Sequence, residues 1–169
     1  MLFHRQADEI CAYATLATAV VAIVALTIAL YHVMVTKHES RRGVAKSIYM
    51  DYPALAFANP KYSSASYPIE NPPINEFASD QMEFERYEYF VSYLLFATEE
   101  ILALTKNDLD WRNTLRDQLK HHAIYLDGSK LPEGHYAEAL HGLRKEAINA
   151  YNAEKLVAKQ LLQRPTLDQ

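Results

Sequence analysis

The 169-residue sequence is poor in glycine and cysteine, with four glycines and one cysteine. A single cysteine, Cys11, excludes a disulfide within the chain and a cysteine-based metal site built from one chain. Apolar residues recur at a period of about 3.6 positions in its patterned segments, and no strand pair is recognisable. We therefore predict an all-α fold.

The chain also lacks a long basic stripe. Its formal net charge is −4, and Lys and Arg gather only in the region that follows the first apolar run. Surfaces that bind nucleic acids are rich in Lys and Arg. We expect no nucleic-acid partner.

Asp, Glu, Lys and Arg are missing altogether from residues 10–35. A helix of that length spans roughly 39 Å, which exceeds the ~30 Å hydrocarbon core of a bilayer. A cleaved signal peptide is the alternative, but its apolar region has ~7 to 15 residues and follows basic ones, whereas Asp8 and Glu9 precede this run. We predict a retained transmembrane helix over residues 10–36, after a short extracytoplasmic N-terminus at residues 1–9. No second run is long enough to span a bilayer.

Basic residues follow this helix in a predicted helical extension over residues 37–50. Loops rich in Lys and Arg stay in the cytoplasm, which places the rest of the chain there. Lys37, Arg41 and Arg42 are predicted to lie at the lipid headgroups, where each basic side chain contributes about 1 kcal/mol near an anionic surface.

One side of the predicted transmembrane helix carries small and polar residues at alternating steps of four and three. Such residues let two helices approach closely, and this repeat predicts a left-handed crossing. We predict helix packing through this seam, although alanines spread along the run could also produce it by chance. The predicted packing residues are Cys11, Thr15, Thr18, Ala22, Ala25, Ala29 and His32.

His32 is the unusual member of the seam, because a transmembrane histidine can ligate a haem or a chlorophyll magnesium. It lies little more than one turn before Lys37, where its ring can reach the headgroups or another helix. We therefore expect no cofactor.

Prolines and aromatic residues mark the next segment, residues 51–79, which we call the strap. Pro53 predicts that the first helix ends at residues 51–53, followed by a short helical turn over residues 53–57. The remainder has no periodicity, and we expect it to lie on a surface, either that of the protein's own helices or that of a partner.

Three amphipathic segments follow in residues 80–165 and predict a small antiparallel three-helix domain. The first begins at Asp80, which stands in capping-box spacing with Glu83, and it runs to about Thr105 before Asn107 breaks it. The second runs from Asp108 or Asp110 to Gly128. The third extends from about Pro132 until Arg164-Pro165 stops it, and residues 166–169 form a tail. Its predicted apolar seam contains Tyr136, Leu140, Leu143, Ala147, Ala150, Val157 and Leu161.

The order of these features resembles that of small bacterial single-pass membrane proteins of unknown function. The residues that carry the resemblance are Tyr52-Pro53-Ala54-Leu55 after the anchor, Glu99-Glu100-Ile101-Leu102 at the end of an aromatic helix, and Trp111 at the start of the next helix. It covers about two thirds of the chain. It implies a bacterial inner-membrane protein with a cytoplasmic helical domain, and it supplies no activity.

Glu138 and His141 have the Glu-x-x-His spacing of metal-binding helical bundles, with Glu99 and Glu100 as further candidate ligands. On a helical wheel, Glu138 and His141 point away from the apolar seam of their helix, and the other two lie off the seam of theirs. We therefore predict no metal site. His122 lies on an apolar face and is predicted to be a core or subsurface histidine with one ring nitrogen hydrogen-bonded.

These observations favour a non-enzymatic single-pass membrane protein. The first interpretation is an accessory, assembly or scaffold subunit whose partners are the lipid bilayer and the transmembrane helices of a larger complex. The second is a self-contained anchored domain that senses or binds a protein, alone or as a homodimer. A metal-dependent helical enzyme is the least favoured.

Overall fold

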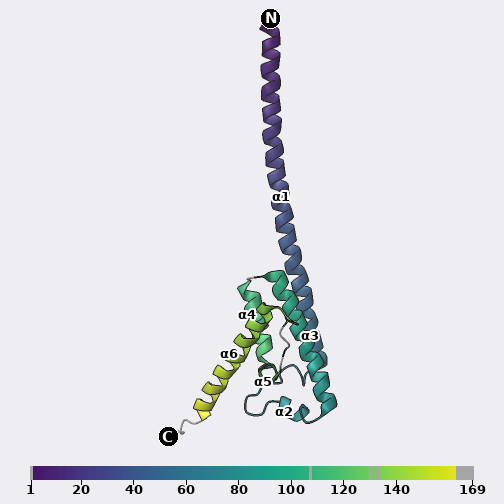
Figure 1. The fold of residues 1–169 in the computed structure, drawn as a ribbon, viewed down its shortest axis with the longest axis vertical. Helices are drawn as coiled ribbons and strands as arrows, with labels where there is room; N and C mark the ends of the chain where they lie inside the picture. The colour runs from purple at the N-terminus through teal and green to yellow at the C-terminus, as the bar shows by residue number, and fades with distance from the viewer. Residues whose placement is uncertain (1, 107, 130, 132–133, 163–169) are drawn as a thin grey trace. The chain divides into compact units, whose positions relative to one another are not determined.

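The computed structural model (Figure 1) describes residues 2–106, 108–129, 131 and 134–162, and the side chains from Tyr13 onward except those of Ala14 and Leu162. The described residues form helices without a strand, which confirms the predicted all-α class. The helices are α1 (Leu2–Ala58), α2 (Ile74–Phe77), α3 (Gln81–Thr105), α4 (Leu109–Lys120), α5 (Ala123–Gly128) and α6 (Glu138–Leu162).

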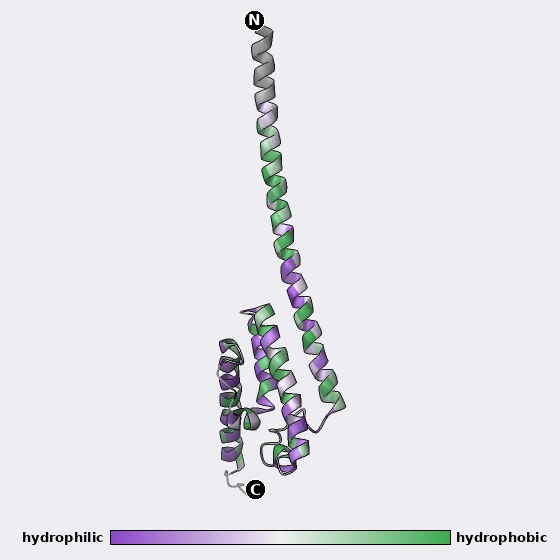
Figure 2. Cartoon of the chain, turned by 45° about the vertical axis from the view of Figure 1, so that its right-hand side comes forward, coloured by the Kyte–Doolittle hydropathy of each residue, from purple (hydrophilic) through white to green (hydrophobic). Residues whose placement is uncertain are grey.

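The chain divides into two compact units, residues 1–42 and residues 43–169. We call them the anchor segment and the helical domain. The described anchor side chains are exposed except that of Arg41, which is partly buried. Figure 2 shows hydrophobic colouring along this part of α1, followed by a hydrophilic stretch. Near the N-terminus, α1 is long and apolar enough to cross a membrane.

The predicted end of the first helix at residues 51–53 is wrong. Helix α1 continues through Pro53 to Ala58, although proline has no N–H to donate to the carbonyl four residues earlier. Packing compensates for the missing hydrogen bond, because Tyr52 is buried and its ring lies 5.7 Å from that of Phe90. Ala45, Ile48 and other residues on the same side of α1 join this core.

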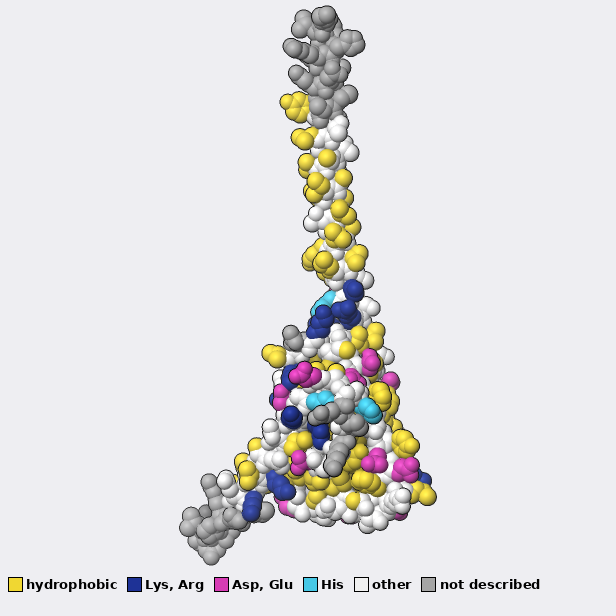
Figure 3. Space-filling view, viewed as in Figure 1, with side chains coloured by type: hydrophobic (Ala, Val, Ile, Leu, Met, Phe, Trp, Pro, Cys, Tyr) yellow, Lys and Arg dark blue, Asp and Glu magenta, His cyan; other side chains and the backbone are white. Residues whose placement is uncertain are grey.

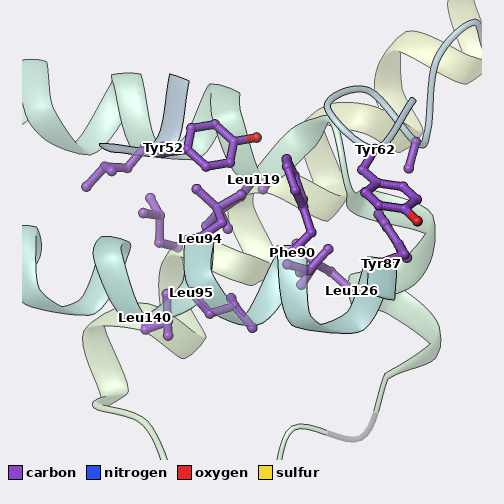
Figure 4. Close-up of a cluster of buried hydrophobic side chains, with 14 of the residues drawn as sticks. Tyr52, Tyr62, Tyr87, Phe90, Leu94, Leu95, Leu119, Leu126 and Leu140 are labelled. Atoms are coloured by element: carbon purple, nitrogen blue, oxygen red, sulfur yellow. The ribbon is translucent and has the colours of Figure 1, made fainter. Parts of the chain in front are cut away.

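Helix α3 supplies the largest part of the core of the helical domain (Figure 4). Its predicted start is confirmed, since Asp80 accepts hydrogen bonds from the backbone N–H groups of Met82 and Glu83. Its predicted end at Thr105 is confirmed as well, and Lys106 leaves the helix with a φ of 51°. The buried residues of α3 are Tyr87, Phe90, Val91, Leu94, Leu95, Ala97, Thr98, Ile101 and Leu102.

The predicted three-helix arrangement of the domain is not what the structure shows. Residues 108–128 form two helices, α4 and α5, with His121 and His122 between them. Asp108 is the N-cap of α4, which confirms Asp108 rather than Asp110 as the start of this segment. Gly128 is the last residue of α5, and Ser129 occupies the C-cap position.

A residue of the strap holds this helix break in place. The backbone N–H of Ser66 donates to the carbonyl of His121 at 2.9 Å, and the Ser66 hydroxyl accepts from the N–H of Ile124 at 3.1 Å. Ser66 thus supplies partners for two backbone groups at the break, the carbonyl of His121 and the N–H of Ile124. Because these groups are hydrogen-bonded, the break loses little hydrogen bonding.

The strap lies on the protein's own helices. Tyr62, Ala65, Ser66 and Ile74 are buried against the helical domain. The short helix α2 lies within the predicted strap and contacts α3.

Helix α6 begins at Glu138, later than expected, and the predicted boundary residues Asn107, Pro132, Arg164 and Pro165 fall outside the described residues. Its first half packs through Leu140, Leu143 and Ala147, mainly on α4 and α5. The predicted apolar seam of this helix also includes Val157 and Leu161, but both side chains are exposed.

Candidate functional site

The predicted packing seam of the anchor lies on a helix that is exposed on every side. Thr15, Thr18, Ala22, Ala25, Ala29 and His32 are all exposed. The side chain of Cys11 lies outside the described residues. Large apolar side chains on the other side, such as Leu16 and Ile23, are exposed too. Side-chain exposure therefore does not distinguish a side of the helix that faces protein from a side that faces lipid. Helix packing through the seam stays a prediction.

The predicted headgroup residues come directly after this apolar stretch. Lys37 and Arg42 are exposed, and Arg41 is partly buried. Figure 3 shows Lys and Arg side chains gathered as a band immediately below the yellow part of the helix. The arrangement places positive charge where the apolar surface ends.

A buried histidine joins three segments of the helical domain. Nε2 of His122 lies 3.1 Å from the Tyr52 hydroxyl of α1, and Nδ1 lies 3.1 Å from the Tyr87 hydroxyl of α3. His122 is fully buried. A neutral imidazole has one donor and one acceptor nitrogen, so one tyrosine donates to the ring and the other accepts from it. The sequence predicted a core histidine with one bonded ring nitrogen, whereas both are bonded.

Burial keeps all three members of this triad uncharged. Desolvation, followed by the effect of His121, lowers the pKa of His122 to about 3. Desolvation is also the main cause that raises the pKa of Tyr52 and of Tyr87 above the usual value. A closed group of neutral, mutually bonded side chains is a polar cross-link of the core, and it offers no open position for a substrate.

A hydroxyl–imidazole pair lies closer to the surface, at a cavity of about 420 Å³ next to Pro53 and Phe57. The hydroxyl of Ser64 is 3.1 Å from Nδ1 of His121. Burial lowers the pKa of His121, with a further contribution from Lys120. Among the described residues, no carboxylate is hydrogen-bonded to the other nitrogen of this ring. The pair therefore ties the strap to the end of α4 and lacks the orienting third member of a hydrolytic triad.

A second groove, of about 520 Å³, lies between the end of α1, the strap and α3. We call it the α1–α3 groove. Its lining residues are Leu55, Asn59, Lys61, Tyr62, Arg86, Tyr89, Phe90 and Tyr93. No local pattern in the sequence predicts this groove, because its walls come from three segments that only the fold brings together.

The carboxylates considered as metal ligands are not gathered in the structure. Glu99 accepts a hydrogen bond of 2.5 Å from the backbone N–H of Ala137, just before α6. Glu138 is exposed, and His141 is partly buried. Within the described part of the chain, no group of three or more His, Cys, Asp or Glu residues is placed to hold a metal ion.

Comparison with protein families, with curated proteins and with solved structures gives no match to this chain.

Proposed function

We propose that this chain is a single-pass protein of the bacterial inner membrane, with its helical domain in the cytoplasm. It acts without catalysis, as an accessory, assembly or scaffold subunit of a larger membrane complex. Its anchor packs on other transmembrane helices through the seam of Thr15, Thr18, Ala22, Ala25 and Ala29, and Lys37, Arg41 and Arg42 bind lipid headgroups.

The observation that carries this proposal is the complete exposure of an apolar helix. None of the most apolar 18-residue window of α1 is buried in the chain itself. Such a helix needs another apolar environment, because exposed apolar surface costs about 25 cal/mol per Å² in water. A bilayer supplies this environment, and small residues on one side allow another helix to pack closely within it.

Replacement of two seam alanines tests the docking. Ala22→Leu with Ala25→Leu adds bulk to the seam, whereas Val20→Leu with Val24→Leu adds bulk to the opposite side. Blue-native electrophoresis in mild detergent should show the unchanged chain and the Val20/Val24 variant in a large complex, and the Ala22/Ala25 variant released from it. Migration of the unchanged chain as a monomer or dimer would refute the subunit role.

The orientation has its own test. Protease added to right-side-out spheroplasts should leave the helical domain intact, and protease added to inverted vesicles should digest it. The opposite pattern would place the domain outside the cytoplasm.

A second function, a self-contained anchored binding domain, is favoured by the strap. Because Tyr62, Ala65 and Ser66 are buried against the domain's own helices, the strap does not need a partner to cover it. In this case the native gel shows the chain alone or as a homodimer, and the ligand binds on the domain surface.

A further inference from the structure

We infer that the α1–α3 groove binds a small molecule that carries one carboxylate on an aromatic or other apolar body. This site goes beyond the docking role of the anchor, and it stands whether or not the anchor packs on other helices.

The walls of the groove suit an apolar body. Leu55, Tyr62, Tyr89, Phe90 and Tyr93 line it, and its volume of about 520 Å³ lies within the range of roughly 300 to 1,000 Å³ typical of ligand sites. Tyr89 is 71% exposed. A planar ligand that stacks on this ring would cover apolar surface that the folded domain leaves in water.

Lys61 and Arg86 supply positive charge at one end. Both are held by the same carboxylate, because Lys61 Nζ donates to Oε2 of Glu83 and Arg86 Nη1 donates to Oε1 at 2.9 Å. Tyr62 also donates to Oε2 of Glu83, at 2.7 Å. The cations are therefore oriented before any ligand arrives, which lowers the entropy lost on binding.

These cations keep donors that Glu83 does not use. A lysine ammonium has three N–H groups and a guanidinium has five. Among the described residues, Arg86 makes one other hydrogen bond, from Nη2 to the sulfur of Met82 at 3.9 Å. Lys61 and Arg86 carry two positive charges and Glu83 carries one negative charge, so the three side chains together have a net charge of +1. Among the described residues that line the groove, none is acidic. One ligand carboxylate balances this charge through charge-assisted hydrogen bonds.

The other end of the groove sets the direction of the ligand. Burial raises the pKa of Tyr93, and the negative charge of nearby Asp51 raises it further. Asp51 therefore repels an anion from the Tyr93 end. The carboxylate is directed to Lys61 and Arg86, and the apolar body lies over Tyr89 and Tyr93.

Titration of the purified full chain in detergent with 2-naphthoate tests the site, and 2-naphthamide serves as the uncharged probe of the same shape. Isothermal titration, with a detergent blank, gives affinity, and the ring signals of ¹³C-labelled tyrosine report location. We expect 2-naphthoate to bind about tenfold or more tightly than 2-naphthamide and to shift the signals of Tyr89 and Tyr93.

Charge removal at the groove should abolish this preference. Lys61→Gln with Arg86→Gln should weaken 2-naphthoate binding about tenfold or more and leave 2-naphthamide unchanged, whereas Lys145→Gln, an exposed lysine of α6, should alter neither. Tyr89→Ala should weaken the binding of both 2-naphthoate and 2-naphthamide. Circular dichroism checks that each variant is folded. Equal affinity for the two probes, unchanged binding in the Lys61/Arg86 variant, or no shift of the two tyrosines would each overturn the proposed site.

Discussion

Protonation of His122 should destabilise the helical domain as the pH falls below its ordinary pKa of 6.5. In the unfolded chain the ring binds a proton near that pH, whereas burial lowers the pKa in the folded domain to about 3. The unfolded state therefore holds more protons between pH 6.5 and pH 3, so stability is full above this window and is lost across it as the pH falls. Between pH 7 and pH 5 the loss from this one group is about 2 kcal/mol.

The single tryptophan of the chain provides the assay. Trp111 is partly buried, and its ring lies 5.6 Å from that of Tyr49, on α1. Its fluorescence should change when the helical domain unfolds in guanidinium, while detergent holds the anchor. Midpoints and slopes measured from pH 7.5 to pH 4.5 give the free energy of unfolding at each pH.

His122→Gln isolates the contribution of this ring. Glutamine can donate and accept but does not titrate, so the variant should lose about 1 to 3 kcal/mol at pH 7 through imperfect hydrogen bonding. Its further loss between pH 7 and pH 5 should be smaller than that of the unchanged chain by about 2 kcal/mol. His121→Gln controls for the neighbouring histidine, whose pKa burial also lowers. If the unchanged chain and His122→Gln lose equal stability over this pH range, the ring does not titrate as the buried geometry requires.

Three further predictions use the same unfolding assay at pH 7. Asp80→Ala removes the cap of α3 and should cost about 1 kcal/mol, whereas Asp80→Asn should cost little because asparagine also caps. Leu143→Ala opens a cavity in the core and should cost about 2 to 5 kcal/mol, whereas Leu161→Ala, at an exposed site, should stay within about 0.5 kcal/mol of the unchanged chain. Ser66→Ala removes the acceptor at the helix break and should cost about 1 to 3 kcal/mol, compared with little effect for the exposed Ser47→Ala.

Local sequence signals predicted α3 best. Its cap at Asp80 and its end at Thr105 depend on residues within one turn of each boundary, and its buried side follows the helical period. The same period predicted the buried residues Leu140 and Leu143 of α6. Neither feature requires knowledge of where another segment lies.

Signals that depend on distant segments were missed. Pro53 normally disfavours a continuing helix, yet packing of Tyr52 in the core keeps α1 helical to Ala58. No glycine or proline marks the break at His121 and His122, because the groups that satisfy it belong to Ser66, 58 residues before Ile124.

The candidate sites also differ in whether the residues of one segment are enough to predict them. Steps of four and three along one helix were enough to predict the seam of Ala22 and Ala25. The α1–α3 groove and the His122 triad could not be predicted, since each combines side chains from three segments.

The position of the strap bears on the proposal that the chain docks into a larger complex. An aromatic segment without periodicity could have lain on a partner, which would have made the domain incomplete by itself. Instead, Tyr62 packs between Phe77, Tyr87 and Phe90, with ring centroids 5.6 to 5.9 Å apart. The strap therefore completes the domain's own core at this point, and no partner is required to cover Tyr62. Release of the complex by Ala22→Leu and Ala25→Leu, with a domain that unfolds normally, is the result that would distinguish a docking anchor from a simple tether.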